Sequence, residues 1–308
     1  MSDWRAALAA EAWNQVRDFT SRHPEYTIAP EQSGGQGNTN YVILGKCGAE
    51  RVVFKYFCQD ERKDREVFGL RHWAASGLVP HLLAEQGRRL IAITLVPGEF
   101  LPAPEPKLAG RTLGQATARL AQTPLSPALA ADFEQRFYEG RSFEQYYMEI
   151  LQASRAIHER VDLYAGSLYG RSLDFVESQL PSLFGSERIL YHQDAANAHF
   201  QDSRFSGFFD LEMCRVGTVA MQLGCLWGVC QLNAVWPSFA SGFAAESGSP
   251  WTWQQDQTSR AVFELLVWRY ISRYGEWHGE PLADGAMAQE RADEAEYRAD
   301  LERSAALA

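Results

Sequence analysis

The segment Ile189-Leu-Tyr-His-Gln-Asp-Ala-Ala-Asn-Ala-His-Phe-Gln-Asp-Ser-Arg-Phe-Ser-Gly-Phe-Phe-Asp-Leu211 determines how the rest of the chain is interpreted. An apolar strand leads into His192-x-Asp194, a short polar turn follows, and a second apolar strand ends at Asp210. Two carboxylates at strand ends suit a pair of roles, in which one accepts a proton from a hydroxyl and the other holds a metal ion on a phosphate. An ordinary β-hairpin with solvated acids in its turns fits the same pattern.

Length and composition indicate an ordinary globular protein. A chain of 308 residues can form two packed lobes or one large α+β domain. Hydrophobic residues make up 46% and charged residues 22%, and the five cysteines lack C-x-x-C spacing, which indicates reduced thiols rather than disulfides or a metal cluster. The formal net charge of -10 argues against nonspecific binding to nucleic acid or to an anionic membrane.

The sequence pattern favours a cytoplasmic protein without a membrane partner. The first residues, Met-Ser-Asp-Trp-Arg, form no apolar signal core. The most apolar run, residues 219–235, contains Gln222 and other polar side chains. Because this run is too short and too polar to span a bilayer, it predicts a buried helix.

The first part of the chain combines a helix with a strand-rich region. Apolar positions about four apart predict an amphipathic helix over residues 3–22. A glycine-rich loop then precedes a strand at 41–44, and no Gly-Lys-Ser/Thr follows it, so it is not a Walker loop. Glycine lets backbone N–H groups approach a phosphate closely, although a plain hairpin turn also fits. The loop residues concerned are Gly34, Gly35, Gly37 and Asn38.

Two charged residues of this region occupy positions that favour burial. Lys55 lies within the β-forming run 51–57, and lysine is seldom buried without a partner. Glu66 lies beside the apolar stripe of a helix predicted over 60–75, so we expect it to point inward and pair with Lys55. The alternatives are a lysine that protects a strand edge and an exposed acid that pairs with a nearby arginine.

A proline-rich segment divides the chain. The buried strand predicted over 89–96 is stopped by a Pro-Gly pair, and residues 101–106 contain three prolines, as is typical of a hinge. We therefore predict an N-terminal lobe over residues 1–100 and a mostly helical C-terminal lobe over residues 101–308.

In this order, the elements resemble the aminoglycoside phosphotransferase and choline kinase superfamily, small-molecule kinases with a protein-kinase-like fold. The resemblance is strongest at His192-Gln-Asp194 and Gly207-Phe-Phe-Asp210, which look like the family's His-Gly-Asp catalytic loop and Ile-Asp-Trp metal strand. Residues 33–41 look like its nucleotide loop, and Leu95-Val-Pro-Gly-Glu99 looks like its hinge exit. The resemblance implies an α+β, bilobal, protein-kinase-like fold, with an antiparallel sheet in a small N-terminal lobe and a larger helical C-terminal lobe.

The resemblance also implies a role for each candidate residue. Asp194 would accept the proton of the substrate hydroxyl or orient that hydroxyl for in-line attack, and Asp210 would bind Mg²⁺ on the nucleotide phosphates. Lys55, steadied by Glu66, would hold the α and β phosphates beneath the glycine loop. Backbone groups from Ile93 to Leu95 would take the adenine edge. Such a site suits phosphoryl transfer, which depends mainly on positioning and electrostatic stabilisation.

Several positions depart from the family pattern. The family has asparagine five residues after the catalytic aspartate as a second metal ligand, and that position is His199 here, as in some macrolide-phosphorylating members. We take His199 as the ligand, although imidazole is an unusual ligand for Mg²⁺. Asn197 is the alternative if the catalytic loop is two residues shorter. His199 as a packed strand residue without a metal is a further possibility. Gln193 replaces a glycine, and Gln222 replaces a downstream acid for which it could supply uncharged hydrogen bonds.

Two functional hypotheses follow. The first is an ATP- or GTP-dependent, Mg²⁺-requiring phosphotransferase that moves the γ-phosphate to a hydroxyl of a small molecule, such as an aminoglycoside, a macrolide, choline or a sugar. The second is a catalytically degenerate kinase-fold protein with a binding or regulatory role, motivated by Gln193, His199 and Gln222. Acidic residues between positions 130 and 150 favour a cationic acceptor, although a run of charges usually forms a solvated face.

Overall fold

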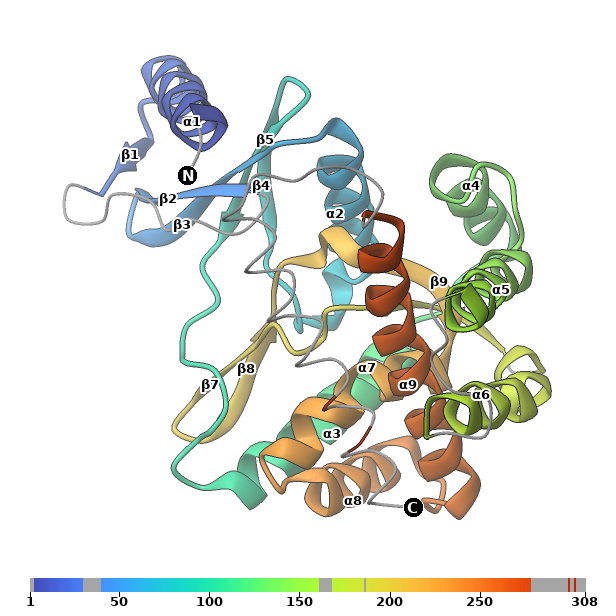
Figure 1. The fold of residues 1–308 in the computed structure, drawn as a ribbon. Coiled ribbons are helices and arrows are strands. Elements are labelled where there is room, and N and C mark those ends of the chain that lie inside the picture. The colour runs from blue at the N-terminus through green and yellow to red at the C-terminus, as the bar shows by residue number, and fades with distance from the viewer. Residues whose placement is uncertain are drawn as a thin grey trace. The chain divides into compact units, whose positions relative to one another are not determined.

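The computed structural model describes residues 3–29, 40–160, 168–185 and 187–277, together with 299 and 302. Two compact units divide the chain, and each is built from two stretches of sequence (Figure 1). The first unit comprises Met1–Glu105 and Asn197–Cys214, and the second comprises Pro106–Ala196 and Arg215–Ala308. Residues 197–214, which the sequence analysis assigned to the C-terminal lobe, therefore pack with the first unit.

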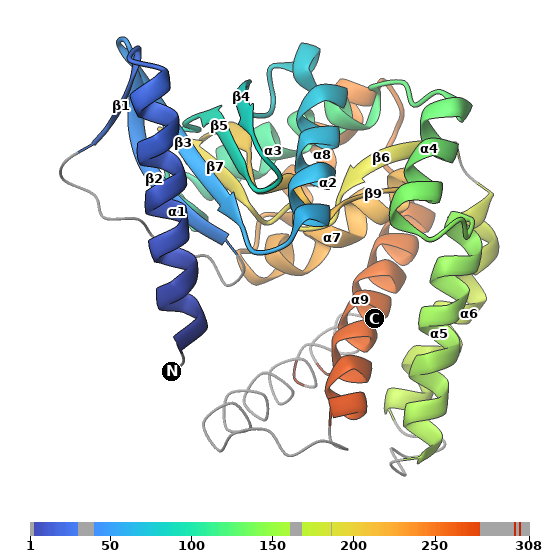
Figure 2. The ribbon, with the colours of Figure 1, turned by 90° about the horizontal axis from the view of Figure 1, so that it is seen from above.

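The first unit is built on an antiparallel sheet with the strand order β1-β2-β3-β5-β4. Helix α1 (Asp3–Arg22) lies along this sheet in Figure 2 and buries Ala12, Val16 and Phe19 in a core shared with the strands. These positions are three or four residues apart and share one helix face, as the sequence predicted. The strands are β1 (Tyr26–Ile28), β2 (Asn40–Cys47), β3 (Glu50–Phe57), β4 (Leu82–Gln86) and β5 (Leu90–Thr94).

Helix α2 (Asp60–His72) connects the sheet to the late segment of the first unit. It is followed by a short 3-10 helix, η1 (Ala74–Ser76), and it packs against another, η2 (Leu211–Met213). Within this contact the Cys214 thiol donates to the backbone carbonyl of Arg65 at 3.2 Å. The segment that follows Asp210 is therefore held against a helix far earlier in the chain.

The two apolar strands expected within 189–211 do not pair with each other as a single hairpin. Strand β6 (Arg188–His192) pairs with β9 (Cys214–Thr218), whereas β7 (Ala198–Gln201) pairs with β8 (Arg204–Phe208). Four of the five β6 residues are buried, so side chains on both faces of this strand are covered. The β7–β8 turn is tight, because Asp202 and Ser203 both have positive φ, of 50° and 59°, as type I′ turns require.

The second unit is mostly helical, and together with the antiparallel sheet of the first unit it confirms the predicted α+β class. Its helix α7 (Val219–Leu232) confirms the buried helix predicted over 219–235. On α7, Gly224 and Gly228 lie four residues apart, where an added Cβ would meet side-chain atoms of Val262 and Phe263 at 2.3 and 2.4 Å, so α7 and α9 pack at close range. The helices are α3 (Pro106–Ala121), α4 (Pro127–Phe137), α5 (Phe143–Arg160), α6 (Leu168–Phe184), α7 (Val219–Leu232), α8 (Trp236–Ser247) and α9 (Trp253–Trp277).

A search of the described helices for a stretch of membrane-spanning length and hydropathy finds none.

Candidate functional site

Lys55 and Glu66 form a buried ion pair in the first unit. Lys55 lies on β3 between two neighbouring strands, opposite Val42 on β2 and Ile91 on β5. Its side chain is 6% exposed and that of Glu66, on α2, is 1% exposed. The ammonium donates to Glu66 Oε2, so the structure contains the pair that the sequence analysis expected. The ammonium of Lys55 is thus shielded from water, because β3 lies between two other strands of the sheet.

Asp210 joins this pair from the segment that follows β8. Its Oδ1 accepts a hydrogen bond from Lys55 Nζ, and its backbone is left-handed, with φ 60° and ψ 56°. Aspartate tolerates this conformation better than most residues, and non-glycine residues held there often lie at functional sites. The Asp210 side chain is 34% exposed, so its carboxylate is accessible to solvent, whereas that of Glu66 is buried.

Glu212 is a further member of the cluster, and the sequence analysis did not select it. Its carboxylate accepts hydrogen bonds from Asn40 Nδ2 and, at 2.7 Å, from Arg62 Nη1, and it lies 3.8 Å from Lys55 Nζ. Asn40 begins β2 directly after the glycine-rich loop, and Arg62 lies on α2. Glu212 therefore ties the start of β2 to α2. An acid two residues after Asp210 was the only sign of it in the sequence.

The charges of this cluster perturb two pKa values. Burial alone would lower the pKa of Lys55, but the carboxylates of Glu66, Asp210 and Glu212 outweigh it and raise the pKa. Burial raises the pKa of Glu66 to about 7; Lys55 opposes this rise and Asp210 adds to it. One ammonium is thus shared by three carboxylates, whose oxygens lie within 4.8 Å of one another. Perturbed groups of this kind are frequent at functional sites.

Asn197 and His199 occupy different places on the β7 side of the site. Asn197 Nδ2 lies 3.4 Å from Asp210 Oδ2, and the backbone carbonyl of Asn197 accepts a hydrogen bond from the Phe209 N–H at 3.0 Å. His199 lies two residues further along and donates from Nδ1 to the Val96 carbonyl at 2.9 Å, because a carbonyl can only accept. Its ring packs on Phe209, with centroids 4.3 Å apart. The structure thus places Asn197 beside Asp210 and His199 beside the hinge.

A cavity of about 280 Å³ lies within the first unit and is lined both by the charged cluster and by the hinge segment, residues 93–96. Apolar side chains supply most of its lining, with Lys55 and Asp210 among the polar ones. Ile93 and Leu95, both expected to contact a base, line it. The Leu95 N–H, however, already donates to the Arg51 carbonyl at 3.1 Å. The other lining residues are Asn40, Val42, Leu44, Val53, Glu66, Pro80, Thr94, Val96, His199 and Phe209.

Gly98 shows how closely the hinge approaches β7. Its φ is 113°, and an added Cβ would lie 2.4 Å from the Phe200 carbonyl oxygen. The neighbouring Glu99 exchanges backbone hydrogen bonds with Phe200, at 3.0 and 2.8 Å. Only glycine meets both requirements, so the predicted Pro-Gly hinge has a steric reason.

Asp194 belongs to the second unit, in the turn that follows β6. It is half-buried, and the residues before it are fixed by side chains. Gln222 Oε1 accepts from the His192 N–H at 2.8 Å, and Gln193 Oε1 accepts from Arg215 Nε. The hydrogen bonds expected of Gln222 are therefore present. Gly34, Gly35, Gly37 and Asn38 lie outside the described residues.

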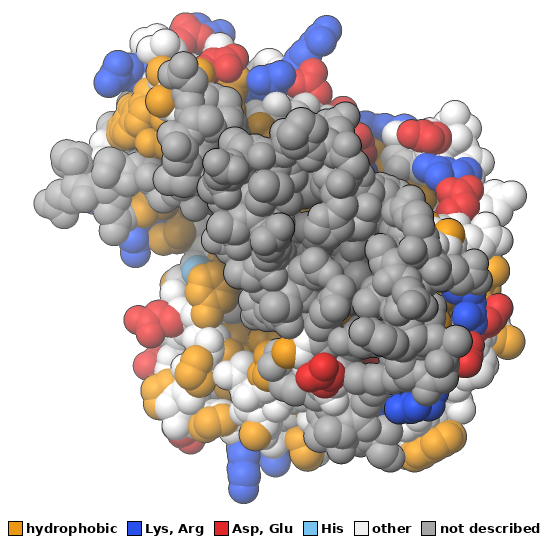
Figure 3. Space-filling view, viewed as in Figure 1, with side chains coloured by type: hydrophobic (Ala, Val, Ile, Leu, Met, Phe, Trp, Pro, Cys, Tyr) orange, Lys and Arg blue, Asp and Glu red, His pale blue; other side chains and the backbone are white. Residues whose placement is uncertain are grey.

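Most of the acidic side chains between residues 130 and 150 pair with arginines of the second unit. Arg188 contacts both Glu134 and Glu144, at 3.0 and 2.8 Å. Arg141 contacts Glu139 and Glu149. Figure 3 shows acidic side chains interspersed with basic ones over α4 and α5. These acids are accounted for by ion pairs and give no support to a cationic acceptor.

Comparisons with known proteins bear on the family and on the fold of this chain. The model of the phosphotransferase enzyme family matches residues 30–258. Macrolide 2'-phosphotransferase MphH from Brachybacterium faecium, as apoenzyme, aligns with a TM-score of 0.62 at 20% identity, covering 92% of this chain and 97% of that chain. Aminoglycoside phosphotransferase APH(2'')-Ib, ADP-bound, aligns with a TM-score of 0.61 at 15% identity, covering 95% and 98%. No curated protein matches the sequence.

The matched region contains the whole of the cluster formed by Lys55, Glu66, Asp210 and Glu212. The structural alignments cover nearly all of both chains and confirm the predicted kinase-like α+β fold. The family model spans well over half of the sequence. The chain therefore belongs to the phosphotransferase enzyme family.

Proposed function

We propose that the protein is a kinase that transfers the γ-phosphate of ATP or GTP to a hydroxyl group of a small molecule. The observation that supports this most is the cluster in which Lys55 contacts Glu66 and Asp210 at one end of an apolar cavity. The buried ammonium can bind phosphate oxygens, and the accessible carboxylate beside it can bind the cation that accompanies them. The apolar remainder of the cavity provides for a base.

The nucleotide would lie along this cavity. The base would rest between the hinge, Ile93 to Val96, and the ring of His199, with Lys55 directed at the α and β phosphates. Since the Leu95 N–H is already bonded to Arg51, a contact between Leu95 and the base would use its carbonyl or its side chain. In this assignment His199 serves the base rather than the metal, and its hydrogen bond to Val96 steadies the hinge.

Asp210 and Asn197 are the residues that we propose to hold Mg²⁺. Their carboxylate and amide oxygens are the hard ligands that Mg²⁺ prefers, and the two side chains already lie within hydrogen-bond distance. When bound, the ion would offset the charge that develops on the phosphate oxygens. The sequence pattern favoured His199 and left Asn197 as the alternative, whereas the contact with Asp210 favours Asn197.

Asp194 is our candidate for the residue that accepts the proton of the acceptor hydroxyl. It is a half-buried carboxylate in a turn, and two residues separate it from Asn197 in the chain. Similar structures include a macrolide phosphotransferase and a complex of gentamicin with an aminoglycoside phosphotransferase. We therefore propose a hydroxylated natural product of the antibiotic type as the acceptor.

The test is a screen for nucleotide-diphosphate release with ATP or GTP, Mg²⁺ and a panel of aminoglycosides, macrolides and hydroxylated metabolites. Once an acceptor is found, Asp194→Ala should lower kcat by about 10²–10⁴-fold, because it removes a general base. Nucleotide binding should persist, since the cavity lies in the first unit. Asp174→Ala, on the exposed face of α6, is the matched control. Unchanged turnover of Asp194→Ala would refute this role, and nucleotide binding without transfer to any acceptor would favour the degenerate-kinase alternative.

A further inference from the structure

The turn that carries Asp194 is attached to the second unit by two side-chain contacts. Gln193, directly before Asp194, is 5% exposed, and its Oε1 accepts a hydrogen bond from Arg215 Nε. Arg215 lies on β9 and is 3% exposed. Gln193 thus contacts the buried guanidinium of Arg215. The family's His-Gly-Asp pattern has a glycine at this position, which has no side chain to make such a contact.

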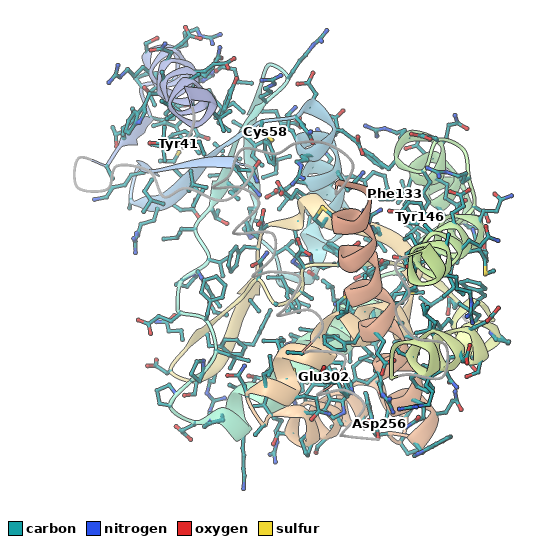
Figure 4. The ribbon with its side chains drawn as sticks, viewed as in Figure 1. Tyr41, Cys58, Phe133, Tyr146, Asp256 and Glu302 are labelled. Atoms are coloured by element: carbon teal, nitrogen blue, oxygen red, sulfur yellow. The ribbon has the colours of Figure 1, made fainter. Side chains whose placement is uncertain are left out.

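Arg215 is itself held by a pair of tyrosines. Its guanidinium carbon lies 5.1 Å from the ring centre of Tyr146, labelled in Figure 4, and 6.0 Å from that of Tyr138. The two rings are stacked, 4.6 Å apart and 6° from parallel. The Tyr138 hydroxyl donates to the Val216 carbonyl at 2.8 Å, on the strand that carries Arg215. Electron-rich ring faces favour a cation that has lost its water, so the guanidinium has a defined position.

The second contact fixes the backbone at the end of β6. Gln222, on α7 and fully buried, accepts from the His192 N–H at 2.8 Å and donates from Nε2 to the His192 carbonyl at 3.4 Å. Both polar groups of the His192 backbone therefore face one amide. The two residues that precede Asp194 are thus both held by side chains, His192 by Gln222 on α7 and Gln193 by Arg215 on β9.

We propose that Arg215, acting through Gln193, and Gln222, acting through His192, are positioning residues that set the orientation of Asp194. The proposal rests on the function proposed above, in which Asp194 contacts the acceptor hydroxyl. Misplacing a reacting group by a small distance lowers the rate of the chemical step without changing substrate binding to the same extent. Loss of either contact should therefore act on kcat and not on the nucleotide KM, because the nucleotide cavity lies in the other unit.

Kinetics of four variants test the contact between Arg215 and Gln193. Gln193→Met keeps the side-chain length and removes the acceptor, whereas Gln193→Glu keeps an acceptor for Arg215. We expect kcat to fall at least tenfold in Gln193→Met and in Arg215→Lys, to stay within threefold of wild type in Gln193→Glu, and nucleotide KM to stay unchanged. In the double variant Gln193→Met/Arg215→Lys, kcat should be no lower than in the worse single variant, because both changes remove one contact.

The matched control is Arg260→Lys. Arg260 also lies over an aromatic ring, that of Phe175 at 4.5 Å, and pairs with Glu264 at 2.8 Å, but it lies on α9, whereas the two proposed contacts come from β9 and α7. It should lose stability with little change in kcat. Losses in kcat that multiply in the double variant, or a loss in Arg260→Lys as large as in Arg215→Lys, would overturn the proposal.

Hydrogen exchange separates this proposal from the proposed function. In Gln193→Met and Gln222→Met, backbone amides of residues 192–196 should exchange at least tenfold faster than in wild type, and Arg260→Lys should leave them unchanged. This result does not depend on turnover. If wild type transfers no phosphate to any acceptor, the proposed function fails while exchange still decides whether the contacts hold the turn. Unchanged exchange in both glutamine variants would overturn the positioning role even in an active enzyme.

Discussion

Lys55 is the residue on which the charged cluster depends. Its ammonium contacts Glu66 and Asp210 and lies 3.8 Å from Glu212. Lys55→Met should lower the free energy of unfolding by about 3–5 kcal/mol, because it leaves buried carboxylates without their cation. Lys63→Met is the matched control: Lys63 is also buried, but its partner Glu85 is 28% exposed and can be hydrated. Urea denaturation measures both, and equal losses in the two variants would contradict the central place of Lys55.

Glu66 makes stability depend on pH. Burial raises its pKa to about 7 from an ordinary value of 4.5, so between these values the folded protein keeps a proton that the unfolded chain releases. The stability from this group is therefore fully present below pH 4.5 and is lost as the pH rises through 7. The slope is at most about 1.4 kcal/mol per pH unit.

Glu66→Gln should flatten that slope, because an amide does not titrate. The free energy of unfolding in urea, measured at pH 5, 6, 7 and 8, should fall less steeply with pH than in wild type. Glu61→Gln, an exposed residue on the same helix, is the control and should keep the wild-type slope. Parallel curves for wild type and Glu66→Gln would show that the pKa of Glu66 is not raised in this way.

At the scale of elements, the β7 strand separates two neighbouring functions. Asn197, directly before β7, lies beside Asp210, whereas His199, within β7, lies beside Val96. Asn197→Ala should raise the Mg²⁺ concentration for half-maximal activity at least tenfold, with little change in nucleotide KM at saturating Mg²⁺. His199→Ala should raise nucleotide KM and leave the Mg²⁺ requirement unchanged. Titrations of both variants with Mg²⁺ and with nucleotide decide the assignment, and the reverse pattern would restore His199 as the ligand.

At the scale of the whole molecule, nucleotide binding should raise the stability of the folded protein. A ligand that binds only the folded state stabilises it by about 2.7 kcal/mol at a hundred times its Kd. ATP or GTP with Mg²⁺ should therefore raise the Tm of wild type by several degrees, and of Asp194→Ala equally, because Asp194 lies outside the cavity-bearing unit. Lys55→Met should lose the shift. An equal shift in Lys55→Met would place the nucleotide elsewhere than in the cavity.

The chain by itself determined the elements and the main charged positions. Periodic apolar residues predicted α1 and α7, and a lysine inside a β-forming run predicted a buried partner, which the structure supplies as Glu66. Patterns of this kind are local, since they depend on which side chains share one face of a helix or strand. The order of the motifs then sufficed to indicate the kinase-like fold.

The tertiary structure decided what depends on contacts between distant segments. Strand β6 pairs with β9 rather than with β8, and these two strands lie on either side of the β7–β8 hairpin in the chain, so the local sequence pattern could not reveal their pairing. Glu212 had no signature of its own, because Asn40 and Arg62 reach it only when α2 packs against the turn after Asp210. Spacing alone could not separate Asn197 from His199. Their neighbours are Asp210 across the hairpin and Val96 in the hinge, and the chain brings these together only by folding.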